Sequence, residues 1–185
     1  MGNITVLANQ ISFEDFMSAR KITEADIKAI IRDNIRDGLA WDFEWGSGVR
    51  RFGCCTTWRS RPGYVRITIS RLLANNNDYE TVRQVVLHEV AHANVGGGHG
   101  HDYVWQREAR RLGTSDSRCY NSGEGSTKAK TLPKKFIGTC PRCGYTCRRN
   151  RRTDCYHKSC GAIAGAIVWT RNPDFDEIKE QLLAV

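Results

Sequence analysis

The sequence predicts an α+β chain made of one compact domain and a smaller metal-binding module. Helical periodicity surrounds the stretch His88-Glu89-Val90-Ala91-His92, and an alternating apolar pattern just before it indicates a pair of strands. Two closely spaced pairs of metal-ligand residues follow near the end of the chain. With 185 residues, the chain is long enough for one domain and a small module, but too short for two full domains.

The predicted boundaries are residues 1–113 for the domain, 114–135 for a basic linker containing Ser, Gly and Lys, and 136–185 for the module with its terminal helix. Near the start, Phe13, Phe16 and Met17 suggest a short amphipathic helix. In the module, Asn172-Pro173 is typical of a helix start, and this last helix is expected to run to about Leu183.

Further helices are predicted from capping residues and apolar spacing. Thr23 is a suitable N-cap for a helix that ends before Gly38, and Asp78 for one from about Tyr79 to Val95. We expect Val82, Val85, Val86, Val90 and Ala93 to mark the buried side of that second helix. Asp102 is the expected cap of a helix that runs through Arg111.

A hairpin is expected before the histidine-containing helix. Residues 50–58 read as one strand, Arg61-Pro62-Gly63 as a turn, and the alternating residues 64–69 as a second strand. Such a strand can border a cleft and pair with an extended peptide. Cys54 and Cys55 are expected to behave as small buried residues.

The spacing of the histidines indicates a zinc site. Two histidines four residues apart lie on one face of a helix, so His88 and His92 can bind one ion, and Glu89 beside them can take a proton from a water held there. A third ligand is still needed, and the turn Gly96-Gly97-Gly98 suits a return of His99 to the metal. His101 remains a rival for that third position. Four of the chain's five histidines lie within residues 88–101.

The C-terminal module has the spacing of a structural zinc ribbon. Cys140-x2-Cys143-Gly forms one knuckle, and His157-x2-Cys160-Gly repeats it with a histidine in the first place. Four protein ligands leave no open position on the metal, which makes the site structural. Cys155 is the rival of His157, and Cys147 is expected to stay outside the site.

Charge is concentrated in this second part of the chain. The overall net charge is +8, but residues 126–160 contain ten Lys and Arg residues against Asp154 alone, so the rest of the chain carries −1. Such a basic module predicts a nucleic-acid partner contacted mainly through phosphate. The expected contact residues are Lys134, Lys135, Arg142, Arg148, Arg149, Arg151 and Arg152.

Composition excludes several other classes of protein. No apolar run is long enough to span a bilayer, and the first residues lack the pattern of a secretory signal. Eight cysteines without an export signal fit reduced thiols and metal ligands better than disulfides. We therefore expect an intracellular protein of the cytoplasm, nucleoid or nucleus that is not secreted, has no membrane partner and is a monomer.

Taken in order, these motifs resemble the SprT-like (Spartan-type) zinc metalloproteases. The resemblance runs from about Arg50 to Val168 and includes residues 68–73, the HExxH helix, Gly98-His99-Gly100 with Tyr103, and the trailing ribbon. It implies a zincin-type helical domain with a small antiparallel sheet, His88, His92 and His99 as zinc ligands, and Glu89 as general base. The stretch between His92 and His99 is shorter than in relatives, and the ribbon has a histidine where a second Cys-x2-Cys pair is usual.

The resemblance also implies DNA-stimulated proteolysis of proteins bound or crosslinked to DNA. Two zinc ions are then expected per chain, one catalytic and one structural. For the oxyanion, His101 and Tyr103 are candidate donors. One alternative is a DNA-binding zinc protein that regulates without cutting, and another is a zinc hydrolase acting on nucleic acid. The intact Glu89 argues against the first, and the lack of a paired carboxylate cluster argues against the second.

Overall fold

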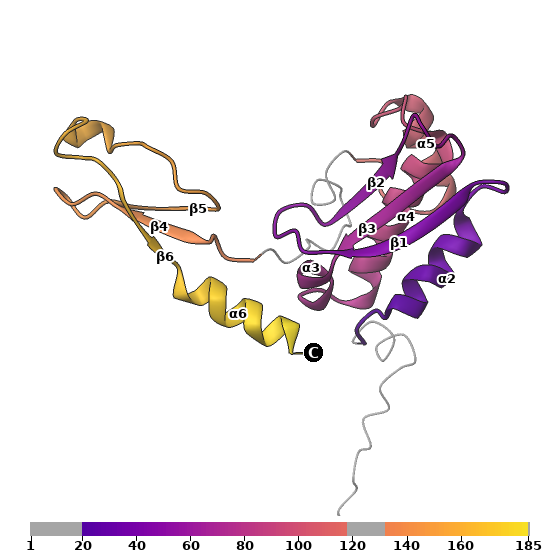
Figure 1. Cartoon of the computed structure of the whole chain (residues 1–185), viewed down its shortest axis with the longest axis horizontal. Helices are drawn as coiled ribbons and strands as arrows, with labels where there is room; N and C mark the ends of the chain where they lie inside the picture. Colours follow the sequence, from indigo (N-terminus) through magenta and orange to yellow (C-terminus); the bar gives the residue numbers. More distant parts are fainter. Residues whose placement is uncertain (1–19, 118–131, 185) are drawn as a thin grey trace, which may run out of the picture. The chain divides into compact units, whose positions relative to one another are not determined.

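The computed structural model describes residues 20–117 and 132–184, in two compact units, Met1–Ala129 and Lys130–Val185 (Figure 1). The helix expected around Phe13, Phe16 and Met17 lies outside the described residues, as does most of the expected linker. In the part of the chain that is described, no helix has the length and apolar character needed to cross a membrane. Every cysteine described there is a free thiol.

The first unit contains a three-stranded sheet of order β1-β3-β2. Strands β2 (Gly53–Thr57) and β3 (Tyr64–Ser70) form the predicted antiparallel hairpin. Strand β1 (Ala40–Gly46) was not predicted, and it pairs in parallel with β3, so the sheet is mixed and the expectation of an antiparallel sheet was wrong here. Phe43 of this strand is buried, and Trp41 and Trp45 pack against the same core.

Within residues 20–117, four helices accompany this sheet: α2 (Glu24–Asn34), α3 (Arg71–Asn75), α4 (Tyr79–Val95) and α5 (Tyr103–Arg111). The predicted caps are confirmed, because the side chains of Thr23, Asp78 and Asp102 accept backbone N–H bonds from the first turns of α2, α4 and α5. Only the short α3, capped by Ser70, was not anticipated.

Helix α4 is the central element of this unit. It packs against the sheet strands β2 and β3 and against α2 and α5 (Figure 1). The five apolar residues predicted for its inner side are all buried: Val82, Val85, Val86, Val90 and Ala93. Burial of each such valine contributes about 1.5–3 kcal/mol relative to an exposed one. The helix therefore has a fixed position, and so do the polar side chains that it carries.

The second unit is a smaller antiparallel sheet of order β5-β4-β6, followed by a helix. Its strands are β4 (Phe136–Thr139), β5 (Thr146–Arg149) and β6 (Val168–Arg171), with a 3-10 turn at Lys158–Cys160. Helix α6 (Pro173–Leu183) begins at the predicted proline. The buried Asn172 side chain donates to the Lys134 carbonyl and thereby ties the start of α6 to the start of β4.

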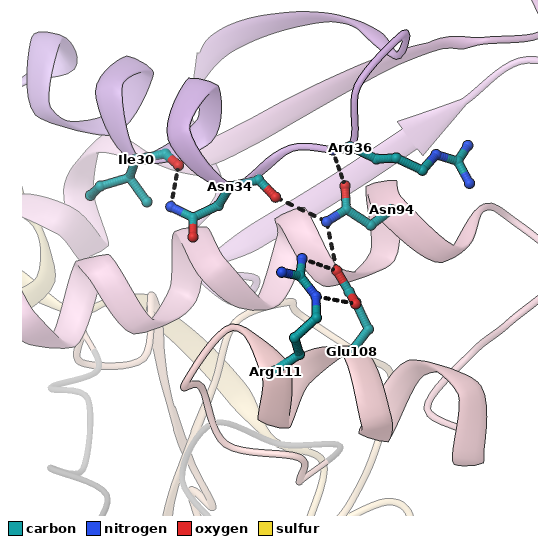
Figure 2. Close-up of polar contacts among 6 residues, drawn as sticks. All are labelled: Ile30, Asn34, Arg36, Asn94, Glu108 and Arg111. Atoms are coloured by element: carbon teal, nitrogen blue, oxygen red, sulfur yellow. Dashed lines mark hydrogen bonds and ion pairs between the residues drawn. The ribbon is translucent and has the colours of Figure 1, made fainter.

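One buried amide joins three helices of the first unit. The Asn94 side chain on α4 accepts the backbone N–H of Arg36 and donates to the Asn34 carbonyl, at 2.8 and 3.0 Å (Figure 2). It also donates to the Glu108 carboxylate on α5 at 2.7 Å, and Arg111 holds that carboxylate from the other side. Asn94 lies two residues after His92, so this network fixes the end of the histidine-bearing helix.

Replacement of this amide is the first test of the fold. Asn94→Ala should lower the free energy of unfolding by about 2 kcal/mol, because buried partners lose their hydrogen bonds. The control is Asn34→Ala, whose side chain bonds only the Ile30 carbonyl of its own helix, and for which a loss of about 0.5 kcal/mol is expected. Urea unfolding at fixed zinc concentration gives both values. Equal losses in the two variants would show that Asn94 does not join the helices.

Candidate metal centre and cleft

Three histidine side chains converge at one point of the first unit. His88 and His92 extend from α4, and His101 comes from the residue just before the N-cap of α5. The Nε2 atom of His101 lies 3.1 Å from that of His92 and 3.2 Å from that of His88. The three nitrogens thus face a common position, two of them from α4 and one from the residue that precedes the N-cap of α5.

This arrangement fits a tetrahedral metal. Zn–N bonds of 2.0–2.1 Å with tetrahedral angles place neighbouring ligand nitrogens about 3.3 Å apart, close to the distances found here. Burial, followed by the neighbouring histidines, lowers the pKa of His88 to about 3 and that of His92 to about 4. Both imidazoles are therefore neutral at physiological pH, which is the state that a metal requires.

A buried tryptophan supports all three imidazoles. The ring centroid of Trp105 on α5 lies 4.7 Å from that of His88, 5.1 Å from that of His92 and 4.5 Å from that of His101. Trp105 has no exposed surface. Because aromatic packing restricts ring rotation, the histidines are held close to their binding orientation by the core itself.

The sequence favoured His99 as the third ligand, but the structure brings His101 to the other two histidines instead. The His99 imidazole pairs with Asp102, Nδ1 to Oδ2 at 2.8 Å, and His101 occupies the place expected for it. Two contacts position this part of the chain. Asp102 accepts the N–H groups of Val104 and Trp105 at the cap of α5, and the Gln106 side chain donates to the His101 carbonyl at 3.1 Å. His99 contributes its backbone instead, as an acceptor for the ring of His92.

Glu89 is buried beside this centre, with a relative exposure of 7%. Burial raises the pKa of its carboxyl to about 7, although the backbone N–H of Cys55 and the charge of Arg51 act in the opposite direction. The strand approaches it so closely that a Cβ at Gly53 would lie 2.6 Å from Oε1 of Glu89. Only glycine leaves room for the carboxylate at this position of β2.

A cleft of about 520 Å³ opens over these residues. Its lining includes the three histidines, Glu89, the outer edge of β2 and the glycine turn after α4. Arg51 and Cys54 also line it, and Cys54 and Cys55 are partly exposed instead of buried as expected. Sequence reasoning missed Arg51, which no motif identifies.

The pairing of β2 decides which of its backbone groups face the cleft. The Ser70 N–H donates to the Phe52 carbonyl, and in an antiparallel ladder every second residue then bonds to the partner strand. Gly53, Cys55 and Thr57 are consequently turned away from β3. The Cys55 N–H, which this register turns towards the free edge, contacts the Glu89 carboxylate. The N–H and C=O groups of Gly53 and Thr57 point to the same free edge.

The two residues considered as oxyanion donors have different environments. Tyr103 is 68% exposed, so it does not pack in the core, and it is not part of the cleft lining. His101 belongs to the three-histidine cluster.

The second unit contains a separate group of ligand residues. Cys140, Cys143, His157 and Cys160 bring one ligand atom each to within 4.8 Å of one another. Nδ1 of His157 lies 3.2 Å from Sγ of Cys143 and 3.4 Å from Sγ of Cys160, and the Tyr145 ring stacks on the imidazole. Burial alone would raise the pKa of the Cys140 thiol, but N–H groups of Cys143 and Arg142 outweigh it and lower that pKa. Among the described residues, Cys147 and Cys155 stay outside the group.

The basic residues singled out in the sequence belong to the second unit. Six of the seven are exposed, Lys135 is partly buried, and within residues 132–184 none forms an ion pair with a carboxylate. Arg142 donates to the Cys160 carbonyl and so has a structural contact within the knuckles. Arg149 lies over Trp169 and Arg152 over Phe136, which holds both guanidinium groups against the sheet.

The fold and the two ligand groups define a class of protein: a mixed α+β chain able to hold one metal ion beside a buried carboxylate and another in a Cys3His knuckle pair. A model of the SprT-like family matches residues 26–125, which is more than half of the chain. The chain therefore belongs to the SprT-like family. No match was found among curated proteins or among solved structures.

Zinc content tests the assignment of the third histidine. The protein should bind two zinc ions per chain, and His101→Ala should retain one, because two imidazoles hold zinc far more weakly than three. His99→Ala is the matched control and should retain both, since its ring contacts Asp102. Elemental analysis after extensive dialysis measures the ratio. Loss of one ion from the His99 variant alone would restore His99 as the ligand.

Proposed function

We propose that the protein is a DNA-associated zinc metalloendopeptidase that hydrolyses peptide bonds in proteins bound or crosslinked to DNA. The observation that carries this proposal is the burial of Glu89 between the three-histidine group and the free edge of β2. Membership of the SprT-like family supports it, because this family is associated with metalloprotease-like activity.

His88, His92 and His101 are the residues that would hold the catalytic zinc. When bound, zinc supplies Lewis-acid activation of water and of the scissile carbonyl. Glu89 has the complementary task of accepting a proton from the attacking water and delivering it to the leaving amine. Its pKa of about 7 and the hydrogen bond from Cys55 suit a carboxylate that must both take up and release a proton.

The free edge of β2 provides a way to hold the peptide. An extended segment can bond to the outward N–H and C=O groups of Gly53 and Thr57, on either side of the residue that contacts Glu89. Main-chain pairing reads no side chains, so it suits an enzyme that must accept many proteins. It also requires the substrate to be locally unfolded at the cleavage site.

The second unit is the proposed DNA-binding part. Cys140, Cys143, His157 and Cys160 would hold a structural zinc. The cations of this unit, which form no ion pair within residues 132–184, would contact phosphate without reading sequence. Localisation on DNA would confine cleavage to proteins attached there. The same cations also favour a second candidate, a DNA-binding regulator that does not cut, and the two candidates differ in what Glu89 does.

Replacement of the carboxylate distinguishes them. Glu89→Gln should lower the rate of cleavage of a DNA-bound basic protein by about 10²- to 10⁴-fold, because the amide cannot take up the proton. Zinc content should stay at two ions, since Gln keeps the acceptor for the Cys55 N–H. Glu80→Gln, on the exposed side of the same helix, is the control and should cleave normally. Cleavage by the Glu89 variant at the normal rate would exclude the mechanism.

The basic residues of the ribbon are tested by salt dependence. Neutralising Arg148, Arg149, Arg151 and Arg152 to Gln should reduce the slope of log affinity against log salt by roughly 3. Arg171→Gln is the control, because Arg171 is already paired with Asp176 and should change the slope little. Fluorescence anisotropy with single- and double-stranded oligonucleotides gives the slopes. An unaltered slope, with the ribbon zinc retained, would place DNA binding elsewhere.

A further inference from the structure

A second pocket of about 190 Å³ adjoins the cleft of the first unit. The two share three lining residues, Thr57, Gly96 and Gly97. A Cβ at Gly97 would lie 2.8 Å from Oγ1 of Thr57, so the end of β2 and the glycine turn come together where the two spaces meet. A chain that lies along β2 beyond the metal centre reaches this pocket next.

Positive charge dominates the lining of this pocket. Arg36 and Arg61 are part of it, and none of its lining residues is acidic. In residues 20–117 and 132–184, neither guanidinium forms an ion pair. Arg66 on the neighbouring strand gives the contrast, since Asp42 and Glu44 neutralise it at 3.4 and 2.9 Å. The pocket therefore has two cationic groups without a carboxylate partner.

The walls of the pocket are largely apolar. Trp58 and Tyr64 have ring centroids 5.5 Å apart, and Leu39 and Pro62 complete the lining. The Arg61 guanidinium lies 4.1 Å from the centre of the Tyr64 ring, which holds it over the pocket. An apolar wall with two cations at its rim, one of them held over an aromatic ring, matches a side chain with a methylene stem and an anionic end.

The register of β2 relates this pocket to the metal centre. Cys55 contacts Glu89 and Thr57 lines the pocket, and both residues face the free edge. Two residues of a strand span about 6.6 Å. A peptide paired with β2 would therefore place a side chain in the pocket about two residues from the one beside Glu89.

We propose that this pocket is a specificity subsite that binds an acidic side chain, preferably glutamate, of the peptide substrate. The proposal rests on the proteolytic function above and adds a substrate preference to it. Glutamate places its carboxylate between the guanidinium groups of Arg36 and Arg61, and its stem packs against the aromatic wall. Strand pairing alone gives no side-chain preference, so the subsite would be the selective element of the cleft.

The test uses the full zinc-loaded chain and a set of quenched fluorescent peptides of one sequence, with Glu, Gln or Lys placed at each position in turn. At one position, wild type should cleave the Glu peptide about 5- to 10-fold more efficiently than the Gln peptide. Arg61→Gln and Arg36→Gln should each reduce that ratio, and Arg61→Glu should reverse the preference towards Lys. Arg59→Gln, an exposed neighbour outside the pocket lining, should leave the ratio unchanged.

The outcomes separate this inference from the function on which it rests. Equal cleavage of all peptides, lost in Glu89→Gln, would overturn the subsite and leave the protease in place. No cleavage of any peptide or of DNA-bound protein would remove both. Normal peptide selectivity in the Arg36 and Arg61 variants, with weaker binding of an oligonucleotide, would assign the pocket to phosphate instead and overturn the proposal.

Discussion

The contact between β2 and Glu89 is the constraint on which the first unit depends. A carboxylate with 7% exposure is costly to bury unless backbone donors satisfy it, and here the Cys55 N–H does so from the edge of the sheet. That hydrogen bond requires the strand to pass directly over the side chain, which only Gly53 permits. The positions of α4 and β2 and the register of β2 are therefore coupled through this one acidic group, which lies in the same cleft as the three histidines.

The histidines depend on the same helix but are held by different contacts. Ligand histidines in proteins commonly donate their second ring nitrogen to a carboxylate or carbonyl. Here the backbone of His99 accepts such a bond from the His92 ring. The Trp105 ring packs against all three imidazoles and restricts their rotation. Packing against a buried aromatic ring thus contributes much of the support for these histidines. The second unit differs, because few of its apolar side chains are buried, and a metal held by its Cys3His group would contribute to its folding.

Much of the helical structure could be predicted from the sequence, because local rules determine it. Thr23, Asp78 and Asp102 cap helices where their side chains and the following apolar spacing indicate. Strand β1 could not be recognised, since its pairing partner β3 is distant in the sequence and parallel pairing leaves no turn signal. The small helix α3 follows its strand without any break and is too short for periodicity to show.

The site was predicted in the same uneven way. Helix geometry alone predicts that His88 and His92 lie on one face. The Cys-x2-Cys and His-x2-Cys spacings alone predict the two knuckles of the ribbon. The identity of the third histidine depends on the conformation of the loop between α4 and α5. The glycine run in that loop favoured His99 in the sequence-based prediction. The sequence offers one further signal, the N-cap Asp102, because it predicts that the neighbouring His101 lies at the start of α5 and not in the middle of the loop. Arg51 and the pocket at Trp58 depend on tertiary packing that no local pattern encodes.

The backbone contact of His99 has a consequence for how this loop can vary. Because its carbonyl and not its ring orients His92, the chemical identity of residue 99 is uncoupled from the geometry of the metal centre. The number of residues between α4 and α5, in contrast, is coupled to that geometry, because one residue more or fewer would move both the His99 carbonyl and His101. Position 99 should therefore tolerate substitution, whereas Gly97, which lies against Thr57, and His101 should not. The length of the segment is constrained as well, although insertions and deletions are usually accepted in exposed loops.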